Sequence, residues 1–183
     1  MQSKHFLKRL ALSLSLALPG LTGVKAEPLN VGQKAPVFEL KDQNGNAVRL
    51  EDRKGKGWTV LYFYPKAGTP GCTTQACAFR DALKSVTDLN AVVYGVSTDE
   101  VAALLNFHEK YHLNFTLLSD PDAKTTEAYG VKMPVVNMAK RWTFIIDPEL
   151  TVRDINDQVD PALDAKTVAQ RLKQLGATAS PTP

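Results

Sequence analysis

Three short runs of aromatic and β-branched residues most constrain the fold of this 183-residue chain: 58–64 (WTVLYFY), 91–97 (AVVYGVS) and 142–147 (WTFIID). The first run shows no alternation of polar and apolar residues, which is typical of a strand buried on both faces of a sheet. Residues 72–83 and 164–175 show helical spacing of their apolar side chains instead. Strands that alternate with helices predict a single α/β domain of three layers.

The remaining segments complete the predicted order of elements. Residues 38–50 alternate around Asn44-Gly45, a dipeptide typical of hairpin turns. Further predicted elements are a helix opened by Asp99-Glu100, a short strand at 115–120, a short helix at 122–129 and a strand after the turn at Pro148-Glu149. Because no repeat or linker divides the chain, we expect one domain over residues 27–176 and a disordered tail over 177–183.

The first 26 residues have the parts of a secretory leader. The first nine contain three basic side chains, residues 10–18 (LALSLSLAL) form an apolar core, and the chain ending at Ala26 resembles a signal-peptidase site. We therefore expect residues 1–26 to be a cleaved signal peptide and the mature protein to be exported to a periplasm. An uncleaved membrane anchor is the alternative, although the apolar core is shorter than the ~20 residues that span a bilayer. After cleavage no stable membrane association is expected.

The leader also accounts for the basic character of the full chain. It contains four of the 22 Lys and Arg residues and none of the 19 Asp and Glu residues. The mature chain therefore has 18 basic and 19 acidic side chains, a net charge of about −1. Because no basic run or aromatic-basic stripe remains either, we expect no nucleic-acid partner.

The two cysteines, Cys72 and Cys77, lie within one 14-residue stretch, YPKAGTPGCTTQAC. Their spacing is wider than the C-x-x-C pair of thioredoxin-like redox centres. On a regular helix, five residues separate the two Cα atoms by roughly 8.6 Å, whereas disulfides rarely tolerate more than about 7 Å. In an oxidising compartment, the simplest interpretation of two nearby cysteines is a permanent structural disulfide. Such a bond would close a tiny loop and disrupt a helical turn, so we favour a disulfide that forms and breaks in a working cycle.

Cys72 follows a predicted strand and a Pro/Gly turn, so we expect it at the start of a helix. There the backbone N–H groups and the helix dipole favour an anion, and the thiolate is the reactive form of cysteine. Thr69 supplies a hydroxyl three residues earlier, within reach of the sulfur or of a bound oxygen. Pro65 and Pro70 stiffen the turn and can shield the sulfur from bulk water.

Residues 63–81, FYPKAGTPGCTTQACAFRD, resemble the active-site segment of peroxiredoxins, with Pro65, Thr69 and Cys72 forming the P-x-x-x-T-x-x-C pattern. The C-x-x-x-x-C spacing is similar to that of the atypical two-cysteine subgroup, called peroxiredoxin Q or bacterioferritin comigratory protein. Further stretches, among them VGQKAPVFEL, VVYGVSTD and RWTFIID, follow in the family's order. The resemblance implies a thioredoxin-like fold with a central mixed β-sheet flanked by helices and an N-terminal β-hairpin extension.

The resemblance also implies thiol peroxidase activity on hydrogen peroxide and organic hydroperoxides, with no metal or organic cofactor. Cys72 would be the peroxidatic cysteine and Cys77 the resolving one, Arg141 matches the family's active-site arginine, and Gln75 occupies an acidic or amide position. A sulfenic acid on Cys72 would become an intramolecular disulfide, which a thioredoxin-like dithiol protein would reduce. Since resolution stays within one chain, we expect a monomer.

One further motif, HEKYH at residues 108–112, matches the H-E-x-x-H pattern of zinc proteases. On a helix, His108 and His112 would share one face with Glu109 beside them. We favour a structural role, because His108 continues the apolar stripe of its helix and no third ligand stands out. Arg141 has a comparable alternative as a solvated charge at the start of a strand.

Two other functions stay open at this point. A thiol-disulfide oxidoreductase acting on proteins would have a similar fold, although the donors Thr69 and Arg141 suit a peroxide better than a protein disulfide. A non-catalytic binding module with the same fold would contain a thiol of ordinary reactivity. Peroxide consumption separates the first alternative from a peroxidase, and alkylation rates across pH separate the second.

Overall fold

The computed structural model describes residues 29–179. The predicted signal peptide, residues 1–26, lies outside this range, as do residues 180–183 of the predicted tail. Within the described range, no helix is long and apolar enough to cross a membrane.

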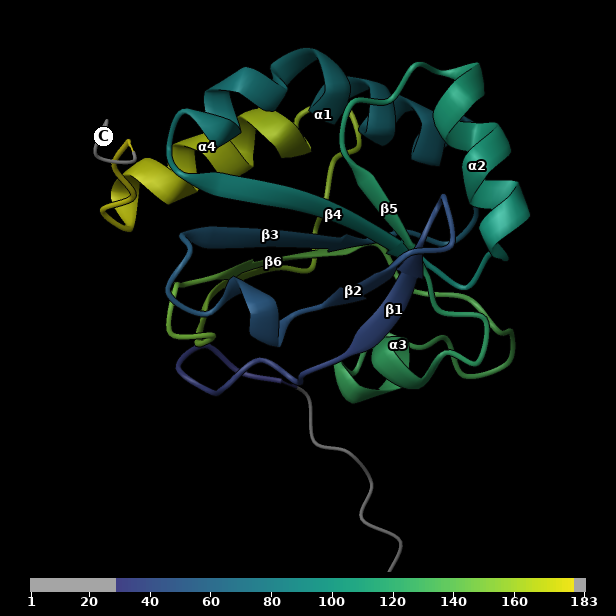
Figure 1. The fold of residues 1–183 in the computed structure, drawn as a ribbon, viewed down its shortest axis with the longest axis horizontal. Coiled ribbons are helices and arrows are strands. Elements are labelled where there is room, and N and C mark those ends of the chain that lie inside the picture. The colour runs from purple at the N-terminus through teal and green to yellow at the C-terminus, as the bar shows by residue number, and fades with distance from the viewer. Residues whose placement is uncertain (1–28, 180–183) are drawn as a thin grey trace, which may run out of the picture.

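Seven strands form one sheet (Figure 1). They are β1 (Glu39–Asp42), β2 (Ala47–Arg49), β3 (Trp58–Phe63), β4 (Ala91–Ser97), β5 (Thr116–Ser119), β6 (Trp142–Ile146) and β7 (Val152–Asn156). Their order across the sheet is β2-β1-β5-β4-β3-β6-β7, with β3, β4 and β5 parallel and every other pairing antiparallel. The predicted mixed sheet is confirmed, and so is the predicted hairpin, since β1 and β2 extend the sheet beyond β5.

Helices cover both faces of this sheet (Figure 1). The helices α1 (Pro70–Thr87), α2 (Val101–Lys110) and α4 (Asp164–Gln174) lie on one face, and the short α3 (Lys124–Ala128) lies on the other. One hydrophobic cluster joins Phe79 of α1, Leu104 of α2 and Leu172 of α4 to the sheet, and a second lies on the opposite face around Tyr129. The three-layer arrangement is therefore confirmed, with a 3-10 turn, η1 (Glu51–Arg53), after β2.

Strand β3 lies in the middle of the sheet, between β4 and β6, and every residue of it after Trp58 is buried. Because successive side chains point to opposite faces, Tyr62 packs into the α1 cluster and Phe63 into the α3 cluster. The prediction of a strand buried on both faces is confirmed. Since α1 follows β3, the cysteine segment lies at the carboxyl end of the central strand, where open α/β sheets commonly bind ligands.

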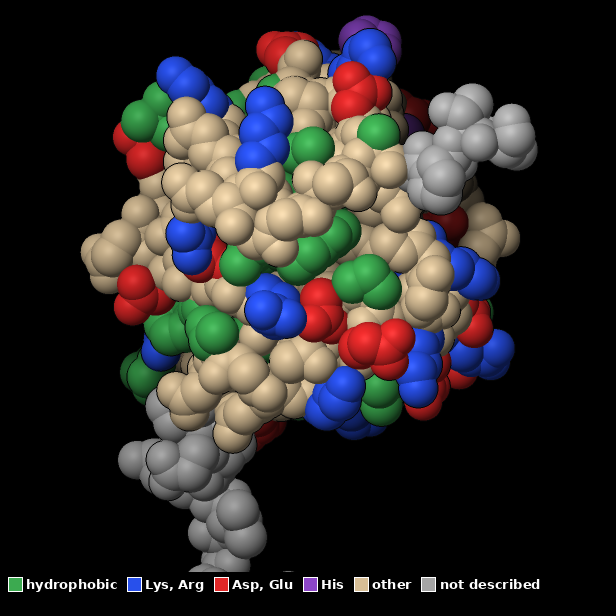
Figure 2. Space-filling view, turned by 90° about the vertical axis from the view of Figure 1, so that its left-hand side faces the viewer, with side chains coloured by type: hydrophobic (Ala, Val, Ile, Leu, Met, Phe, Trp, Pro, Cys, Tyr) green, Lys and Arg blue, Asp and Glu red, His purple; other side chains and the backbone are tan. Residues whose placement is uncertain are grey.

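The amino ends and the carboxyl ends of the parallel strands lie on opposite sides of the molecule. In Figure 1, β3 and β4 begin at the left, whereas α1 begins at the right, near α2. Figure 2 views the left-hand side, where Lys and Arg side chains are interspersed with Asp and Glu and hydrophobic side chains lie in small groups. The cysteine segment belongs to the other end.

The chain after α4 corrects one expected boundary. Gly176 has a positive φ of 85°, which reverses the chain at the end of the helix. The amide of Ala177 then donates to the Leu172 carbonyl, and the Ala177 side chain is buried in the core. The prediction of disorder from residue 177 is therefore wrong at its first residue, because Ala177 takes part in the helix cap.

Candidate active site

Strand pairing brings Arg141 to the cysteine helix. Phe63, the last residue of β3, pairs with Trp142, the first residue of the antiparallel β6. The loop that leaves the carboxyl end of β3 therefore lies next to the segment that contains Arg141 and enters β6. Cys72 is the third residue of α1, and only 1% of it is exposed.

Arg141 contacts the sulfur of Cys72 directly. Its Nη2 lies 3.2 Å from Sγ, and its Nη1 donates to Oε1 of Gln75. Gly71 leaves room for the guanidinium group, since a Cβ at that position would lie 3.3 Å from Nη2. The guanidinium group of Arg141 and the amino end of α1 therefore both lie beside the sulfur.

A buried polar row lies behind Arg141. Nε2 of Gln75 donates to Oδ2 of Asp164 over 2.7 Å, and the Thr143 hydroxyl donates to the same oxygen over 2.8 Å. Gln75 is 0% exposed and Asp164 1%. Burial raises the pKa of the Asp164 carboxyl, while the hydrogen bonds from Thr143 and Gln75 oppose that shift. Because Asp164 accepts from the amide nitrogen, the amide oxygen of Gln75 faces Arg141.

Asp164 is a site residue that the sequence does not reveal. An acidic residue in the first turn of a helix is ordinarily explained by the helix dipole, so its type and position carry no separate signal. Its partner Gln75 lies 89 residues earlier in the chain, and only the packing of α1 against α4 joins them. The single available hint is the polar Gln75, which falls close to the apolar stripe of α1.

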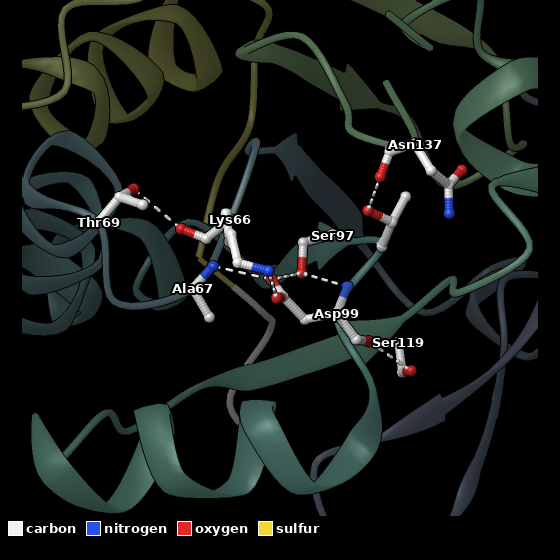
Figure 3. Close-up of polar contacts among 8 residues, drawn as sticks. Lys66, Ala67, Thr69, Ser97, Asp99, Ser119 and Asn137 are labelled. Carbon is white, nitrogen blue, oxygen red and sulfur yellow. Dashed lines mark hydrogen bonds and ion pairs between the residues drawn. The ribbon is translucent and has the colours of Figure 1, made fainter. Parts of the chain in front are cut away.

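Thr69 is placed beside the start of α1, but its hydrogen is directed elsewhere than predicted. It is the N-cap residue of α1, and its hydroxyl donates to the carbonyl oxygen of Lys66 over 2.9 Å (Figure 3). The lone pairs of Oγ1 are therefore what Thr69 can offer to a bound molecule. Pro65 is half-buried in the same loop, and Pro70 is the first residue of the helix, where the missing N–H is tolerated.

Aromatic side chains enclose the inner side of the sulfur. Cys72 belongs to a buried cluster with Tyr62, Tyr64 and Phe79, in which Tyr62 stacks between the other two rings at centroid distances of 5.5 and 4.8 Å. Burial raises the pKa of the Tyr62 and Tyr64 hydroxyls, so both stay neutral at physiological pH. The charged group that contacts the sulfur is therefore Arg141, and the neutral aromatic side chains pack in the same cluster as Cys72.

The comparison with known proteins agrees with this geometry. The sequence profile of the AhpC/TSA family matches residues 31–155. The chain belongs to this family. It is 47% identical over 127 residues to the peroxiredoxin Bcp of Bacillus subtilis, and this match covers 66% of this chain and 80% of that protein. It is 38% identical over 179 residues to the chloroplastic peroxiredoxin Q of Populus jackii, with 95% and 82% covered.

Solved structures of AhpC/TSA relatives extend the likeness to the fold. Peroxidoxin BcpB from Mycobacterium tuberculosis gives a TM-score of 0.75 at 35% identity, with 79% of this chain and 97% of that one covered. A cysteine mutant of PrxQ from Xylella fastidiosa gives a TM-score of 0.76 at 31% identity, with 81% and 98% covered. The resemblance to the Bcp and peroxiredoxin Q subgroup and the thioredoxin-like fold are confirmed. The chain is thus a peroxiredoxin, a thiol peroxidase.

In this AhpC/TSA protein, both cysteines lie on one continuous helix. Cys77 is half-buried, five residues after Cys72, and both are free thiols. Helix geometry separates such Cα atoms by roughly 8.6 Å, beyond the reach of a disulfide at about 7 Å. A bond between Cys72 and Cys77 therefore requires the first turns of α1 to open.

The zinc-protease alternative required His108 and His112 to share one helical face. Helix α2 ends at Lys110, and His112 lies beyond it with a positive φ of 49°. The expected shared face is therefore wrong, because the chain leaves the helix before the second histidine. Over residues 29–179, no three His, Cys, Asp or Glu side chains are placed to hold a metal ion together.

Proposed function

We propose that this peroxiredoxin reduces hydrogen peroxide and organic hydroperoxides with Cys72 as the peroxidatic residue. The observation that carries the proposal is the 3.2 Å contact between Cys72 Sγ and Arg141 Nη2 at the start of α1. A solved relative, the bacterioferritin comigratory protein of Xanthomonas campestris, is described by its alkyl peroxide reduction activity. This chain is 33% identical to it at a TM-score of 0.71, with 75% of this chain and 91% of that one covered.

In the first step, the Cys72 thiolate attacks one peroxide oxygen in line with the O–O bond. The bond breaks, Cys72 becomes a sulfenic acid, and the other oxygen leaves as hydroxide or alkoxide and takes up a proton. Negative charge develops on the leaving oxygen, so preorganised donors stabilise the transition state. Arg141 supplies one donor, and the N–H of Cys72 supplies another, since the first N–H groups of a helix have no intrahelical partner.

Thr69 and Pro65 complete this arrangement. Because the hydroxyl hydrogen of Thr69 goes to Lys66, its oxygen can accept a hydrogen bond from the O–H of a hydroperoxide. Arg141 and Thr69 then hold the peroxide by a donor and an acceptor, which fixes its direction relative to the sulfur. We assign Pro65 the role of shielding the sulfur from bulk water.

In the second step, the thiol of Cys77 attacks the sulfenic sulfur of Cys72. A disulfide forms, and water leaves with the sulfenic oxygen. An external dithiol then attacks the disulfide and leaves as its own disulfide, which returns both cysteines to thiols. We assign this role to a thioredoxin-like protein.

Export and oligomeric state belong to the same proposal. The leader over residues 1–26 would deliver the enzyme to a periplasm, where it would act as a monomer because resolution needs no second chain. The mass of the protein recovered from the compartment checks the leader, since cleavage after Ala26 predicts a first residue of Glu27.

Steady-state consumption of hydrogen peroxide and of a bulky alkyl hydroperoxide, with thioredoxin and its reductase as the electron source, tests the proposed function. We expect multiple turnovers with each substrate. The thiol-disulfide oxidoreductase alternative predicts the opposite pattern, in which the protein reduces insulin disulfides without peroxide and leaves peroxide unconsumed.

Removal of the carboxyl group behind Gln75 is expected to slow the peroxide step. Asp164→Ala frees the Gln75 amide to rotate, so Arg141 loses a fixed partner, and we expect the rate constant of Cys72 with peroxide to fall about tenfold, roughly 1.4 kcal/mol. Asp164→Asn keeps an oxygen that can accept from both Gln75 and Thr143, so it should restore most of the rate. Stopped-flow measurement of the reduced protein with hydrogen peroxide gives this constant.

A matched control is Asp154→Asn. Asp154 lies on β7 and forms an ion pair with Arg171 of α4, the helix that also carries Asp164, but this ion pair has no link to Arg141. The variant should react with peroxide at the wild-type rate. A wild-type rate in Asp164→Ala would show that the buried row does not position Arg141.

A further inference from the structure

The carboxylate of Asp99 lies under the loop that carries the cysteine helix. Asp99 follows β4 and is 9% exposed. Its Oδ2 accepts from the backbone N–H of Ala67 over 2.7 Å and from the Ser97 hydroxyl over 2.8 Å, and its Oδ1 lies 3.5 Å from Nζ of Lys66 (Figure 3). The Ser119 hydroxyl donates to the Asp99 carbonyl over 2.7 Å, so β5 fixes Asp99 from the other side.

The same loop supports the first turn of α1. The Thr69 hydroxyl donates to the Lys66 carbonyl over 2.9 Å, and the amide of Thr73 donates to the Thr69 carbonyl over 2.9 Å. A continuous series of hydrogen bonds therefore runs from Asp99 through the loop to the turn that contains Cys72. Figure 3 shows the first part of this series, with Thr69 and Asp99 on opposite sides of Lys66 and Ala67.

This series opposes the second step of the reaction. A disulfide between Cys72 and Cys77 requires the first turns of α1 to open, as shown above for the two Cα atoms. Opening moves Cys72 away from Arg141 and strains or breaks the bonds that tie the loop to Asp99. While the turn stays closed, a sulfenic acid on Cys72 remains beside Arg141, where it can react with a second peroxide molecule.

We propose that Asp99 is a positioning residue that sets how long oxidised Cys72 stays in the closed turn before Cys77 reaches it. Two reactions compete for the sulfenic acid in that time. Attack by Cys77 forms the disulfide and releases water, whereas attack on a second hydroperoxide transfers one more oxygen, giving a sulfinic acid and an alcohol or water. The inference rests on the roles proposed above for Cys72 and Cys77.

Asp99→Ala should change the two steps in opposite directions. The loop loses its charged acceptor, so the turn opens more often, and we expect disulfide formation to accelerate about tenfold. The hydroperoxide concentration that converts half of Cys72 to the sulfinic acid should rise by about the same factor. The reaction of reduced Cys72 with peroxide should slow down, because the closed turn is less populated.

The experiment is a single turnover of the full protein with hydrogen peroxide, quenched at intervals and analysed by mass spectrometry for thiol, sulfenic, disulfide and sulfinic forms. Asp99→Asn is the second variant, since its amide oxygen can still accept from Ala67 while the charge is removed. It should fall between the wild type and Asp99→Ala, and it carries the test if Asp99→Ala does not fold. Hydrogen exchange at the Thr73 amide should rise in the same order.

Asp147→Ala is the matched control. Asp147 is also 9% exposed and accepts hydrogen bonds from the amides of Glu149 and Thr151, but it lies at the far end of β6 from Arg141. It should leave the ratio of disulfide to sulfinic acid unchanged. An equal change in this control, an unchanged ratio in Asp99→Ala, or an Asp99→Asn variant as altered as Asp99→Ala would overturn the proposal. Failure of the proposed function is distinguishable, because the wild type would then form no sulfenic acid at all.

Discussion

Replacement of Cys72 by serine is expected to abolish hydroperoxide consumption, with a loss of at least about a thousandfold. A serine hydroxyl stays protonated at neutral pH, and its oxygen cannot form the sulfenic intermediate on which the cycle depends. Neither Arg141 nor the start of α1 compensates, because both act on a negative charge that the variant does not develop. Steady-state consumption of hydrogen peroxide with a thioredoxin donor measures the loss.

The design has an internal control for folding. Serine is nearly the size of cysteine and can still accept a hydrogen bond from Arg141, so the thermal unfolding of the Cys72→Ser variant should stay close to that of the wild type. Consumption of hydroperoxide at the wild-type rate by this variant would refute the peroxidase proposal. Rapid alkylation of the wild type but not of Cys72→Ser would identify Cys72 as the reactive thiol.

Replacement of Cys77 by serine is expected to separate the two steps. The reduced variant should consume one equivalent of peroxide in a burst and then stop when a thioredoxin-like protein is the only reductant, since no disulfide forms for that donor to attack. The burst should be as fast as in the wild type within about twofold, because the fixed donors lie at Cys72 and Arg141. Stopped-flow kinetics give the burst, and trapping with dimedone identifies the sulfenic acid.

A small thiol provides the control for the second prediction. Dithiothreitol can reach the sulfenic sulfur directly, so it should restore some turnover to Cys77→Ser while the protein donor does not. Sustained turnover of Cys77→Ser with thioredoxin, at the wild-type rate, would show that Cys77 is not the resolving residue. A slow burst would instead place Cys77 in the peroxide step.

The strands and helices could be predicted from the sequence because their signals are local. The unbroken apolar run of β3, the Asn44-Gly45 turn and the helical spacing after Cys72 each reflect the environment of one segment. Prediction was wrong where a local pattern did not say where the chain would turn. His112 fits a helical pattern but lies beyond the end of α2, and Ala177 fits a tail but completes a cap.

The site could be predicted only in part, for a related reason. Cys72 and Thr69 belong to one short motif, and a family resemblance suggested Arg141 from the strand that follows it. The residues that hold them come from distant parts of the chain, with Asp164 joined to Gln75 on α1 and Asp99 to the amide of Ala67. Such contacts depend on the packing of helices and on the strand order, which no short segment encodes.

The antiparallel pairing of β3 and β6 has a consequence for how this chain can tolerate insertions. Successive side chains along a strand point to opposite faces of the sheet. One extra residue between Trp142 and Ile145 would therefore turn the side chains that precede the insertion to the opposite face and move Arg141 away from Cys72. The pairing of β6 with β7 already contains a shift between Ile145 and Ile146. Insertions are therefore better tolerated after Ile146 than before it. The unshifted pairing of the first residues of β6 with β3 sets the position of the Arg141 guanidinium group relative to the Cys72 sulfur.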